Sequence, residues 1–414
     1  MEKAIICALD LGDTSIRYKM DELKNLANAC DIEVIYEIIQ KAKEINNAYY
    51  VGSGKVDEIK MAINTLNADI VIFNNELSPA QIRNLEKKLD CKIIDKTLLI
   101  LDIFAKRANT KESILEVELA QLKYMLPRLV GLRSSLSRQG GGFNAKGPGE
   151  KKIELDRRHI EAQIYKLKQE LSKITKDKEI RKNKRLNDNI PLVALVGYTN
   201  AGKSATMNTL INQFSDNQNK DVFEKNMLFA TLNTSVRRLK THTKQEFLLS
   251  DTVGFVSDLP HHLVNSFKST LDEIKDADLL LHVVDISNPF YEDQIKTTNE
   301  CLADINANNI ETIYVFTKAD LLENQFFPYY ENSILISNKT NQNIDLLVNK
   351  IKELLFKDNT IVDLFIPYEE SYVLPKLENI ALVYNKNNID NGILAKAELS
   401  KKLLFEYSKY IYKK

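Results

Sequence analysis

The sequence has little glycine, proline or cysteine, and it lacks any long apolar run. It holds 13 glycines, 9 prolines and 4 cysteines in 414 residues. Cys7, Cys30, Cys91 and Cys301 lie far apart and form no CxxC pair, which argues against a zinc site and for reduced thiols in the core. No stretch reaches the roughly 18 apolar residues of a membrane span, and the N-terminus lacks a secretion-signal pattern. We therefore expect a cytoplasmic protein without a membrane span, while peripheral membrane association stays open.

The sequence also lacks a net charge. Its 57 Lys and Arg residues balance its 57 Asp and Glu residues, so affinity for nucleic acid must come from a local patch. A hydrophobic fraction of 44% and a charged fraction of 28% are ordinary for globular proteins. At about 100 to 200 residues per domain, a chain of this length predicts several domains, and we expect three.

Apolar periodicity divides the chain into segments. In residues 1–95, apolar runs such as EVIYEII and ADIVIFN alternate with helix-like stretches, which predicts an N-terminal α/β subdomain. Residues 96–175 are rich in helix formers and predict a helical hairpin with a glycine-rich, basic tip. The polar, basic stretch 176–189 has no apolar period and predicts a linker. Residues 359–414 predict a small C-terminal domain.

Residues 190–358 predict a domain built on a mostly parallel sheet. The near-continuous apolar runs PLVALVG, EFLLSDTVG, LLLHVVDIS, TIYVFTKAD and SILIS are separated by amphipathic helical stretches. Strands have this composition when helices cover both faces of a parallel sheet. The expected fold class is therefore α/β.

A phosphate-binding motif follows the first of these strands. GYTNAGKS, Gly197 to Ser204, matches GxxxxGKS/T between a buried strand and a helix, which is the context in which this motif binds phosphates. Gly197 and Gly202 allow the backbone N–H groups to face the nucleotide phosphates. Lys203 then neutralises the terminal phosphates, and Ser204 ligates Mg²⁺. The motif predicts a P-loop nucleotide site.

Three further motifs end later strands. In DTVG, Asp251 holds Mg²⁺ directly or through water, and Gly254 is free to turn toward the terminal phosphate. In TKAD, which begins at Thr317, Asp320 can accept hydrogen bonds from the guanine amide and amine, and Lys318 can pack along the base. ISNKT ends the next strand, where its loop can brace the base. One such element at each successive strand end predicts a GTPase that uses Mg²⁺.

These motifs and their surroundings resemble the HflX family of ribosome-associated GTPases, within the translation-factor class. Besides GYTNAGKS and DTVGF, the resemblance rests on LFATL, ELSPAQIRNLE, LILDIFAKRA, VELAQLKYMLPRL, and SRQGGG with GPGEKKIELDRR. It runs from about residue 30 to residue 340 and is weak beyond residue 360. The resemblance implies a three-domain layout, GTP hydrolysis and GTP-dependent binding to the large ribosomal subunit.

The motifs and the resemblance together define the candidate residues. The GTP-binding candidates are Gly197, Tyr198, Thr199, Asn200, Ala201, Gly202, Lys203, Ser204, Ala205, Phe229, Ala230, Thr231, Asp251, Thr252, Val253, Gly254, Thr317, Lys318, Asp320, Ser337, Asn338 and Lys339. The Mg²⁺ candidates are Ser204, Thr231 and Asp251, and the catalytic candidates are Lys203, Thr231 and Gly254. The resemblance at LFATL makes Thr231 the switch threonine that closes on Mg²⁺, with Thr234 as the alternative.

Two positions depart from common GTPase patterns. Thr317 stands where the family usually has asparagine, which leaves guanine selection in place and makes the affinity less certain. Phe255 follows DTVG, where many GTPases carry a glutamine that orients the attacking water. Because an apolar ring cannot polarise water, we expect slow intrinsic hydrolysis and a geometry that a partner, the ribosome in this family, completes.

The glycine-rich stretch Ser137–Glu150, SRQGGGFNAKGPGE, contains five of the thirteen glycines. An apolar seam follows it at Ile153, Ile160, Ile164, Leu167, Leu171 and Ile174, which predicts a helix packed on its partner in the hairpin. Between Arg128 and Arg158 lie eight basic residues against three acidic ones. The stretch therefore predicts an RNA contact, or otherwise a solvated hairpin tip. The RNA-binding candidates are Arg133, Arg138, Phe143, Lys146, Lys151 and Lys152.

These observations predict a GTP-hydrolysing factor that binds the large ribosomal subunit and its rRNA. The resemblance alone adds the splitting or rescue of stalled or stressed ribosomes. We expect no DNA partner and a monomer away from the ribosome. One alternative is an RNA-binding chaperone or unwinding factor that uses the GTPase domain as a switch. Another is a nucleotide-dependent enzyme with its substrate site in the N-terminal domain, where no carboxylate pair, Cys/His couple or metal cluster supports it.

Overall fold

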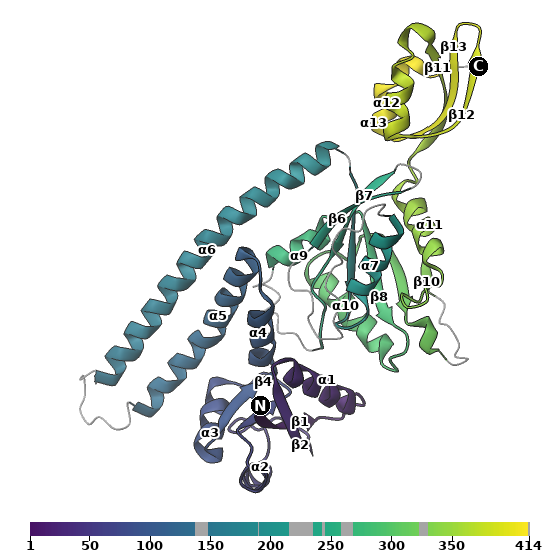
Figure 1. The fold of residues 1–414 in the computed structure, drawn as a ribbon. Helices are drawn as coiled ribbons and strands as arrows, with labels where there is room; N and C mark the ends of the chain where they lie inside the picture. Colours follow the sequence, from purple (N-terminus) through teal and green to yellow (C-terminus); the bar gives the residue numbers. More distant parts are fainter. Residues whose placement is uncertain are drawn as a thin grey trace. The chain divides into compact units, whose positions relative to one another are not determined.

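The computed structural model describes residues 1–136, 148–188, 190–214, 235–241, 245–257, 268–322 and 330–412. These residues form a sheet of four strands, a sheet of six and a sheet of three (Figure 1). Contacts divide the chain into two compact units. Of the described residues, 1–179, 253–257 and 268–271 belong to the first unit, and all others belong to the second.

The four-stranded sheet is parallel, in the order β2-β1-β3-β4. Its strands are β1 (Glu2–Asp10), β2 (Ile32–Lys41), β3 (Ile70–Phe73) and β4 (Lys92–Asp95). The helices between them are α1 (Ile16–Ala29), α2 (Ser53–Leu66) and α3 (Pro79–Leu89). Residues 4–10 of β1 are all buried, as expected for a central strand covered on both faces. All four cysteines of the chain are free.

Helices α4 (Lys96–Arg107) and α5 (Lys111–Leu136) follow as two helices in series. The fully buried Asp95 joins β4 to both of them. It accepts hydrogen bonds from the Leu98 amide (2.9 Å) at the start of α4 and from the Tyr124 hydroxyl (2.6 Å) in α5. The guanidinium of Arg128 lies 3.2 Å from the Tyr124 ring centroid and also binds Asp95. This cluster ties the second half of α5 to the end of β4.

Helix α6 (Pro148–Asp188) lies beside α5 and packs through the predicted seam. The two helices run side by side (Figure 1). Leu167 is buried against Leu115 and Leu119, with further apolar neighbours along both helices. The helix continues through Asp188, so the stretch predicted as a linker is helical over most of its length. Its Lys, Arg and Glu residues are good helix formers, and an apolar period is not required once a helix has begun.

The six-stranded sheet has the order β10-β9-β8-β5-β7-β6, parallel except for the β6–β7 pair. This confirms the predicted mostly parallel α/β sheet. Its strands are β5 (Leu192–Gly197), β6 (Ser235–Lys240), β7 (Glu246–Asp251), β8 (Leu279–Asp285), β9 (Thr312–Thr317) and β10 (Ser333–Leu335). The accompanying helices are α7 (Lys203–Phe214), α9 (Lys268–Lys275), α10 (Tyr291–Asp304) and α11 (Ile344–Leu355).

The last sheet is antiparallel, in the order β11-β13-β12. It comprises β11 (Thr360–Pro367), β12 (Leu382–Ile389) and β13 (Gly392–Leu399), with α12 (Val373–Ile380) and α13 (Lys401–Glu406). The carboxylate of Glu398 accepts hydrogen bonds from Tyr384 Oη (2.8 Å), Asn359 Nδ2 (3.0 Å) and Gln245 Nε2 (2.8 Å). Gln245 directly precedes β7, so this one side chain links the small sheet to the six-stranded one.

Candidate nucleotide-binding site

The loop between β5 and α7 has the backbone geometry of a phosphate cradle. Gly197 and Gly202 have φ values of +143° and +97°, and Asn200 between them has φ +62°. A Cβ at Gly197 would lie 2.2 Å from the carbonyl oxygen of Val283, so the close approach of β5 to β8 requires glycine. The loop therefore opens onto the N-terminus of α7, which favours anionic groups.

Lys203, the first residue of α7, is buried beside this loop. Its Nζ donates to the carbonyl oxygens of Gly197 (3.1 Å) and Tyr198 (2.7 Å). Burial lowers the pKa of the Lys203 ammonium to about 8, although the negative charge of Asp251 raises this pKa and so offsets part of the effect of burial. An anionic phosphate beside the ammonium would favour its charged form and reverse this shift.

Two oxygen ligands suited to Mg²⁺ lie together beside the loop. The hydroxyl of Ser204 donates to Asp251 Oδ2 at 2.8 Å, and Asp251 is fully buried at the end of β7. Hydroxyl and carboxylate oxygens are the ligands that Mg²⁺ prefers, so this donor set fits the ion. The next residue, Thr252, donates from Oγ1 to the carbonyl oxygen of Leu195 (2.6 Å) and so ties the end of β7 to β5.

The TKAD segment is joined to the phosphate loop through Thr317. Its hydroxyl donates to the carbonyl oxygens of Ala201 (2.7 Å) and Val284 (3.2 Å). Threonine thus makes a side-chain contact to the loop from the position where the family usually has asparagine. Lys318, with φ +62°, forms an ion pair with Asp285 at 2.6 Å.

The carboxylate expected to read guanine is held by the ISNKT segment. Asp320 Oδ1 accepts from the hydroxyl of the buried Ser337 at 2.6 Å, and this hydrogen bond lowers the pKa of Asp320. Asn338 donates from Nδ2 to Thr206 Oγ1 (3.0 Å) at the start of α7. Within the described residues, the buried Asn338 Oδ1 and Thr199 Oγ1 have no hydrogen-bond partner, which fits a site for a polar ligand.

Sequence reasoning missed part of this arrangement. Asp285 ends the strand that carries LLLHVVD, and its place at a strand end beside TKAD was an available signal. Thr206 carried no motif signal. Conversely, Phe229, Ala230, Thr231 and Thr234 lie outside the described residues, as do Arg138, Phe143 and Lys146. Arg133 lies in α5, and Lys151 and Lys152 lie in α6, but their side chains are outside the description too.

The remaining nucleotide candidates lie where their motifs place them. Tyr198 and Ala201 are buried in the loop, and Ala205 is in the first turn of α7. Val253 and Phe255 are buried in the segment that follows β7, on either side of Gly254. Lys339 contributes its positive charge to the lowered pKa of Asp320.

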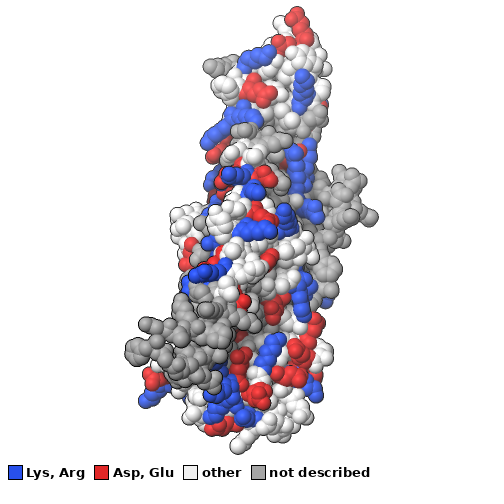
Figure 2. All heavy atoms as spheres, turned by 90° about the vertical axis from the view of Figure 1, so that its left-hand side faces the viewer, with Lys and Arg blue, Asp and Glu red and all other residues white. Residues whose placement is uncertain are grey.

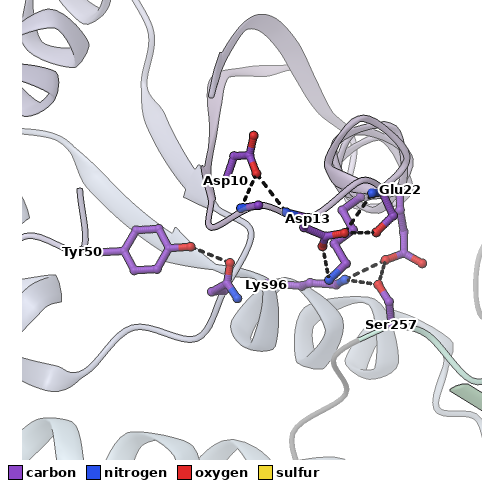
Figure 3. Close-up of polar contacts among 10 residues, drawn as sticks. Asp10, Asp13, Glu22, Tyr50, Lys96 and Ser257 are labelled. Carbon is purple, nitrogen blue, oxygen red and sulfur yellow. Dashed lines mark hydrogen bonds and ion pairs between the residues drawn. The ribbon is translucent and has the colours of Figure 1, made fainter. Parts of the chain in front are cut away.

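The segment after DTVG makes a polar contact that no motif predicted. The ion pair between Lys96 in α4 and Glu22 in α1 has an N–O distance of 2.6 Å, and both side chains are 3% exposed. Ser257 Oγ accepts from Lys96 Nζ at 2.9 Å and donates to Glu22 (Figure 3). Ser257 is three residues beyond Gly254, so the segment that follows DTVG belongs to a buried polar cluster of the first unit.

The acidic residues at the end of β1 shape a turn. Asp10 Oδ1 accepts from the amides of Gly12 (2.9 Å) and Asp13 (3.1 Å), and Asp13 pairs with Lys19 at 2.9 Å (Figure 3). The hydroxyl of Ser15 also donates to Asp13 and lowers its pKa to about 2. These contacts assign the two carboxylates to local structure and give the alternative of an enzyme site there no support.

A parallel sheet with a GxxxxGKS loop, a Mg²⁺-type oxygen pair and a guanine-type TKAD segment defines a P-loop GTPase. Three families match successive parts of the chain: "GTP-binding GTPase N-terminal" over residues 17–105, "GTP-binding GTPase Middle Region" over 107–185 and "50S ribosome-binding GTPase" over 192–318. Together they cover the N-terminal sheet except β1, the helical hairpin, and the six-stranded sheet as far as Lys318.

Curated relatives match nearly the whole chain. The GTPase HflX of Caldanaerobacter subterraneus subsp. tengcongensis is 44% identical over 400 residues, which are 96% of this chain and 91% of that protein. The GTPase HflX of Escherichia coli is 38% identical over 361 residues, 86% of this chain and 83% of that protein. The chain therefore belongs to the HflX family of GTPases, and it binds and hydrolyses GTP.

The chain is also similar to a solved structure. The crystal structure of a GTP-binding protein from the archaeon Sulfolobus solfataricus in complex with GDP is 23% identical, with a TM-score of 0.44. The match covers 86% of this chain and 99% of that one.

Among the described residues, no helix is both long and apolar enough to cross a bilayer.

Proposed function

We propose that this chain binds the large ribosomal subunit in its GTP-bound state and uses GTP hydrolysis to reset itself, and that it thereby splits or rescues stalled or stressed ribosomes. One observation supports this most directly. Residues 192–318 match the "50S ribosome-binding GTPase" family, and residues 17–105 and 107–185 match the families of the N-terminal and middle regions of GTP-binding GTPases. We further propose that the protein acts in the cytoplasm as a monomer away from the ribosome.

We assign the following roles at the site, and that of Thr231, which lies outside the described residues, rests on the resemblance at LFATL. The amides of residues 197–205 bind the phosphates, and Lys203 neutralises their charge. Ser204 and Asp251 hold Mg²⁺, with Thr231 joining them in the GTP-bound state. Bound Mg²⁺ supplies charge neutralisation between the terminal phosphates. The amide of Gly254 would donate to the terminal phosphate.

Base recognition is assigned to the TKAD and ISNKT segments. Asp320, which accepts a hydrogen bond from Ser337, would accept from guanine. Lys318, which pairs with Asp285, can lie along the base. Thr317 transmits the position of TKAD to the phosphate loop through Ala201. An adenine ring lacks the paired donors that the Asp320 carboxylate requires, so GTP is the favoured nucleotide.

Slow intrinsic hydrolysis is expected from Phe255. Its ring is only 2% exposed and has no group that could orient a water molecule. A partner therefore has to complete the hydrolytic geometry, and we assign this role to the large subunit. The RNA-binding candidates at the hairpin tip provide the complementary contact to rRNA.

The test is GTP turnover with and without purified large ribosomal subunits, together with co-sedimentation in the presence of a GTP analogue or GDP. We expect stimulated turnover and binding that favours the GTP analogue. Lys203→Ala should abolish both by removing the phosphate counter-charge, whereas replacing Arg138 and Lys146 with glutamate should weaken subunit binding and leave the GTP affinity unchanged. Unstimulated turnover and nucleotide-independent binding would contradict the proposal.

The alternative of an RNA chaperone remains distinguishable by the same assay. A chaperone that uses the GTPase domain only as a switch should bind free structured RNA as tightly as it binds large subunits. A strong preference for large subunits is the outcome that favours our proposal.

A further inference from the structure

The outward face of α6 differs from its flanks in charge. We define the outer stripe as Arg158, Ala162, Tyr165, Lys166, Gln169, Ser172, Lys173 and Lys176, all of which are exposed. These positions follow the three- and four-residue spacing of one helix face. They lie opposite the seam, where Ile164, Leu167, Leu171 and Ile174 pack against α5.

None of the eight positions that define the stripe is acidic, and the exposed Asp177 follows directly after its last lysine. The acidic residues of this part of α6, such as Glu161 and Glu170, lie at the sides. Figure 2 looks onto the side of the molecule where α6 lies in Figure 1, and it shows basic and acidic side chains interspersed. Acidic side chains are therefore missing from the eight positions of the stripe, but they are present elsewhere on the side of the molecule that Figure 2 shows.

The lysines of the stripe are not used by the fold. Elsewhere on α6, Lys178 pairs with Glu112 at 2.9 Å and Arg157 pairs with Glu161 at 2.9 Å. By contrast, Lys166, Lys173 and Lys176 have no ion-pair partner in the part of the chain that the structure describes. Lys173 and Lys176 are three residues apart, a spacing at which like charges repel. Glu170 and Asp177 lie within about one helical turn of Lys173, but neither forms an ion pair with it in the part of the chain that the structure describes.

The flank beside the stripe adds positive charge. Lys123 of α5 and Lys168 of α6 are close enough that the charge of Lys168, after the larger effect of burial, lowers the pKa of Lys123. A partner with negative charge would relieve this repulsion as well as that within the stripe.

We propose that the outer stripe is a second RNA contact, separate from the hairpin tip, which binds the phosphate backbone of double-stranded RNA. It rests on the proposed association with the large subunit and extends it. From Arg158 to Lys176 the stripe spans about 27 Å at 1.5 Å per residue, long enough to reach several phosphates. Double-stranded RNA is recognised mainly through its shape and backbone, which lysines on a straight helix suit.

The stripe's chemistry fits RNA better than the other acidic partners. A membrane-surface helix needs an apolar face to insert, but the apolar face of α6 is buried against α5. The cores of protein interfaces are depleted in lysine and rely on large apolar or aromatic anchors. Between residues 158 and 176 the stripe offers one such side chain, Tyr165, which is 65% exposed and can also contact a ribose or base.

The test compares two triple variants of the full-length protein. One is Lys166→Gln, Lys173→Gln and Lys176→Gln in the stripe. The control is Lys376→Gln, Lys401→Gln and Lys402→Gln, which removes the same charge from exposed positions of the C-terminal domain. Glutamine and lysine have similar helix propensities, and circular dichroism checks that the helix content is unchanged.

Binding is measured to a 20-base-pair RNA duplex and to purified large subunits over a range of salt concentrations. Each lost phosphate contact should reduce the slope of log K against log salt by about 0.9, so the stripe variant should lose about 2 to 3 in slope on the duplex. Its affinity should fall by roughly 10- to 100-fold at low salt, while the control stays within about twofold. Large-subunit binding should weaken in the same direction.

Several outcomes would overturn the inference. Equal losses in both variants would assign the binding to overall charge, and no loss in the stripe variant would make the stripe a solvated face. Stripe-dependent binding to vesicles with 30% anionic lipid, with RNA binding unchanged, would assign the stripe to membranes. If the wild type binds the duplex through the stripe but does not bind large subunits, the stripe stands and the proposed function fails.

Discussion

Replacing Gly197 with alanine perturbs the phosphate loop at its most constrained point. The added Cβ would lie 2.2 Å from the carbonyl oxygen of Val283, and this oxygen belongs to the central strand β8, which cannot shift without disturbing the sheet. Overpacking costs about 1–3 kcal/mol, and a residue other than glycine at a φ of +143° adds about 1–3 kcal/mol. Gly197→Ala should therefore destabilise the loop by about 2–6 kcal/mol.

The assay is a GTP titration combined with a thermal melt. If the strain falls on the binding-competent loop, GTP affinity should drop by at least about 30-fold, since about 1.4 kcal/mol corresponds to tenfold. Gly54→Ala in α2 is the control because its Cβ meets nothing within 4 Å, and it should be neutral or slightly stabilising. Gly202→Ala should be intermediate, with φ +97° and a contact of 3.4 Å to Thr317 Oγ1. If Gly197→Ala matched Gly54→Ala in affinity and melting temperature, the geometric reasoning would be refuted.

Two further predictions concern buried polar groups. Lys96→Met leaves the buried Glu22 carboxylate without its counter-charge, so the free energy of opening measured by hydrogen exchange in α1 and α4 should fall by about 3–5 kcal/mol. The double variant Lys96→Met with Glu22→Gln should regain most of the protection against exchange. If Lys96→Met alone were as protected as the wild type, the role of the ion pair would be contradicted. Burial lowers the pKa of His282 to about 3, so below pH 6.5 the unfolded state binds a proton that the folded state does not, and stability should fall from pH 6.5 toward 3. The melting temperature of His282→Leu should fall less steeply with decreasing pH than that of the wild type. The control His159→Gln, at an exposed position, should follow the wild type. If the melting temperature of His282→Leu fell as steeply as that of the wild type, the buried, uncharged state of His282 would not explain the loss of stability in acid.

The nucleotide loop was predictable because its residues are close in sequence. GYTNAGKS between a buried strand and a helix fixes the positions of Lys203 and Ser204. The contact from Ser204 to Asp251 followed from strand ends meeting at one edge of a parallel sheet. The hydrogen bond from Ser337 to Asp320 obeys the same rule, since β9 and β10 are neighbours.

Contacts between distant segments could not be predicted from one sequence. Glu22, Lys96 and Ser257 carry no motif, and only the folded chain brings them together. Thr317 was seen as a departure from the family pattern, but its hydroxyl contact to Ala201 depends on the distance between two loops. The helical conformation of residues 176–188 was missed because an absent apolar period was given more weight than helix propensity.

The carboxylate of Glu398 has a practical consequence for dividing this protein into fragments. A fragment that ends with α11 would leave Gln245 without the acceptor that its side chain uses in the whole chain. It would also remove Asn359 and Tyr384 together with Glu398, their shared partner. The gap between α11 and β11 is therefore a poor place to cut, even though it separates two sheets. Fragments meant to isolate the GTPase domain should keep the three-stranded sheet or replace Gln245 with a residue that needs no acceptor.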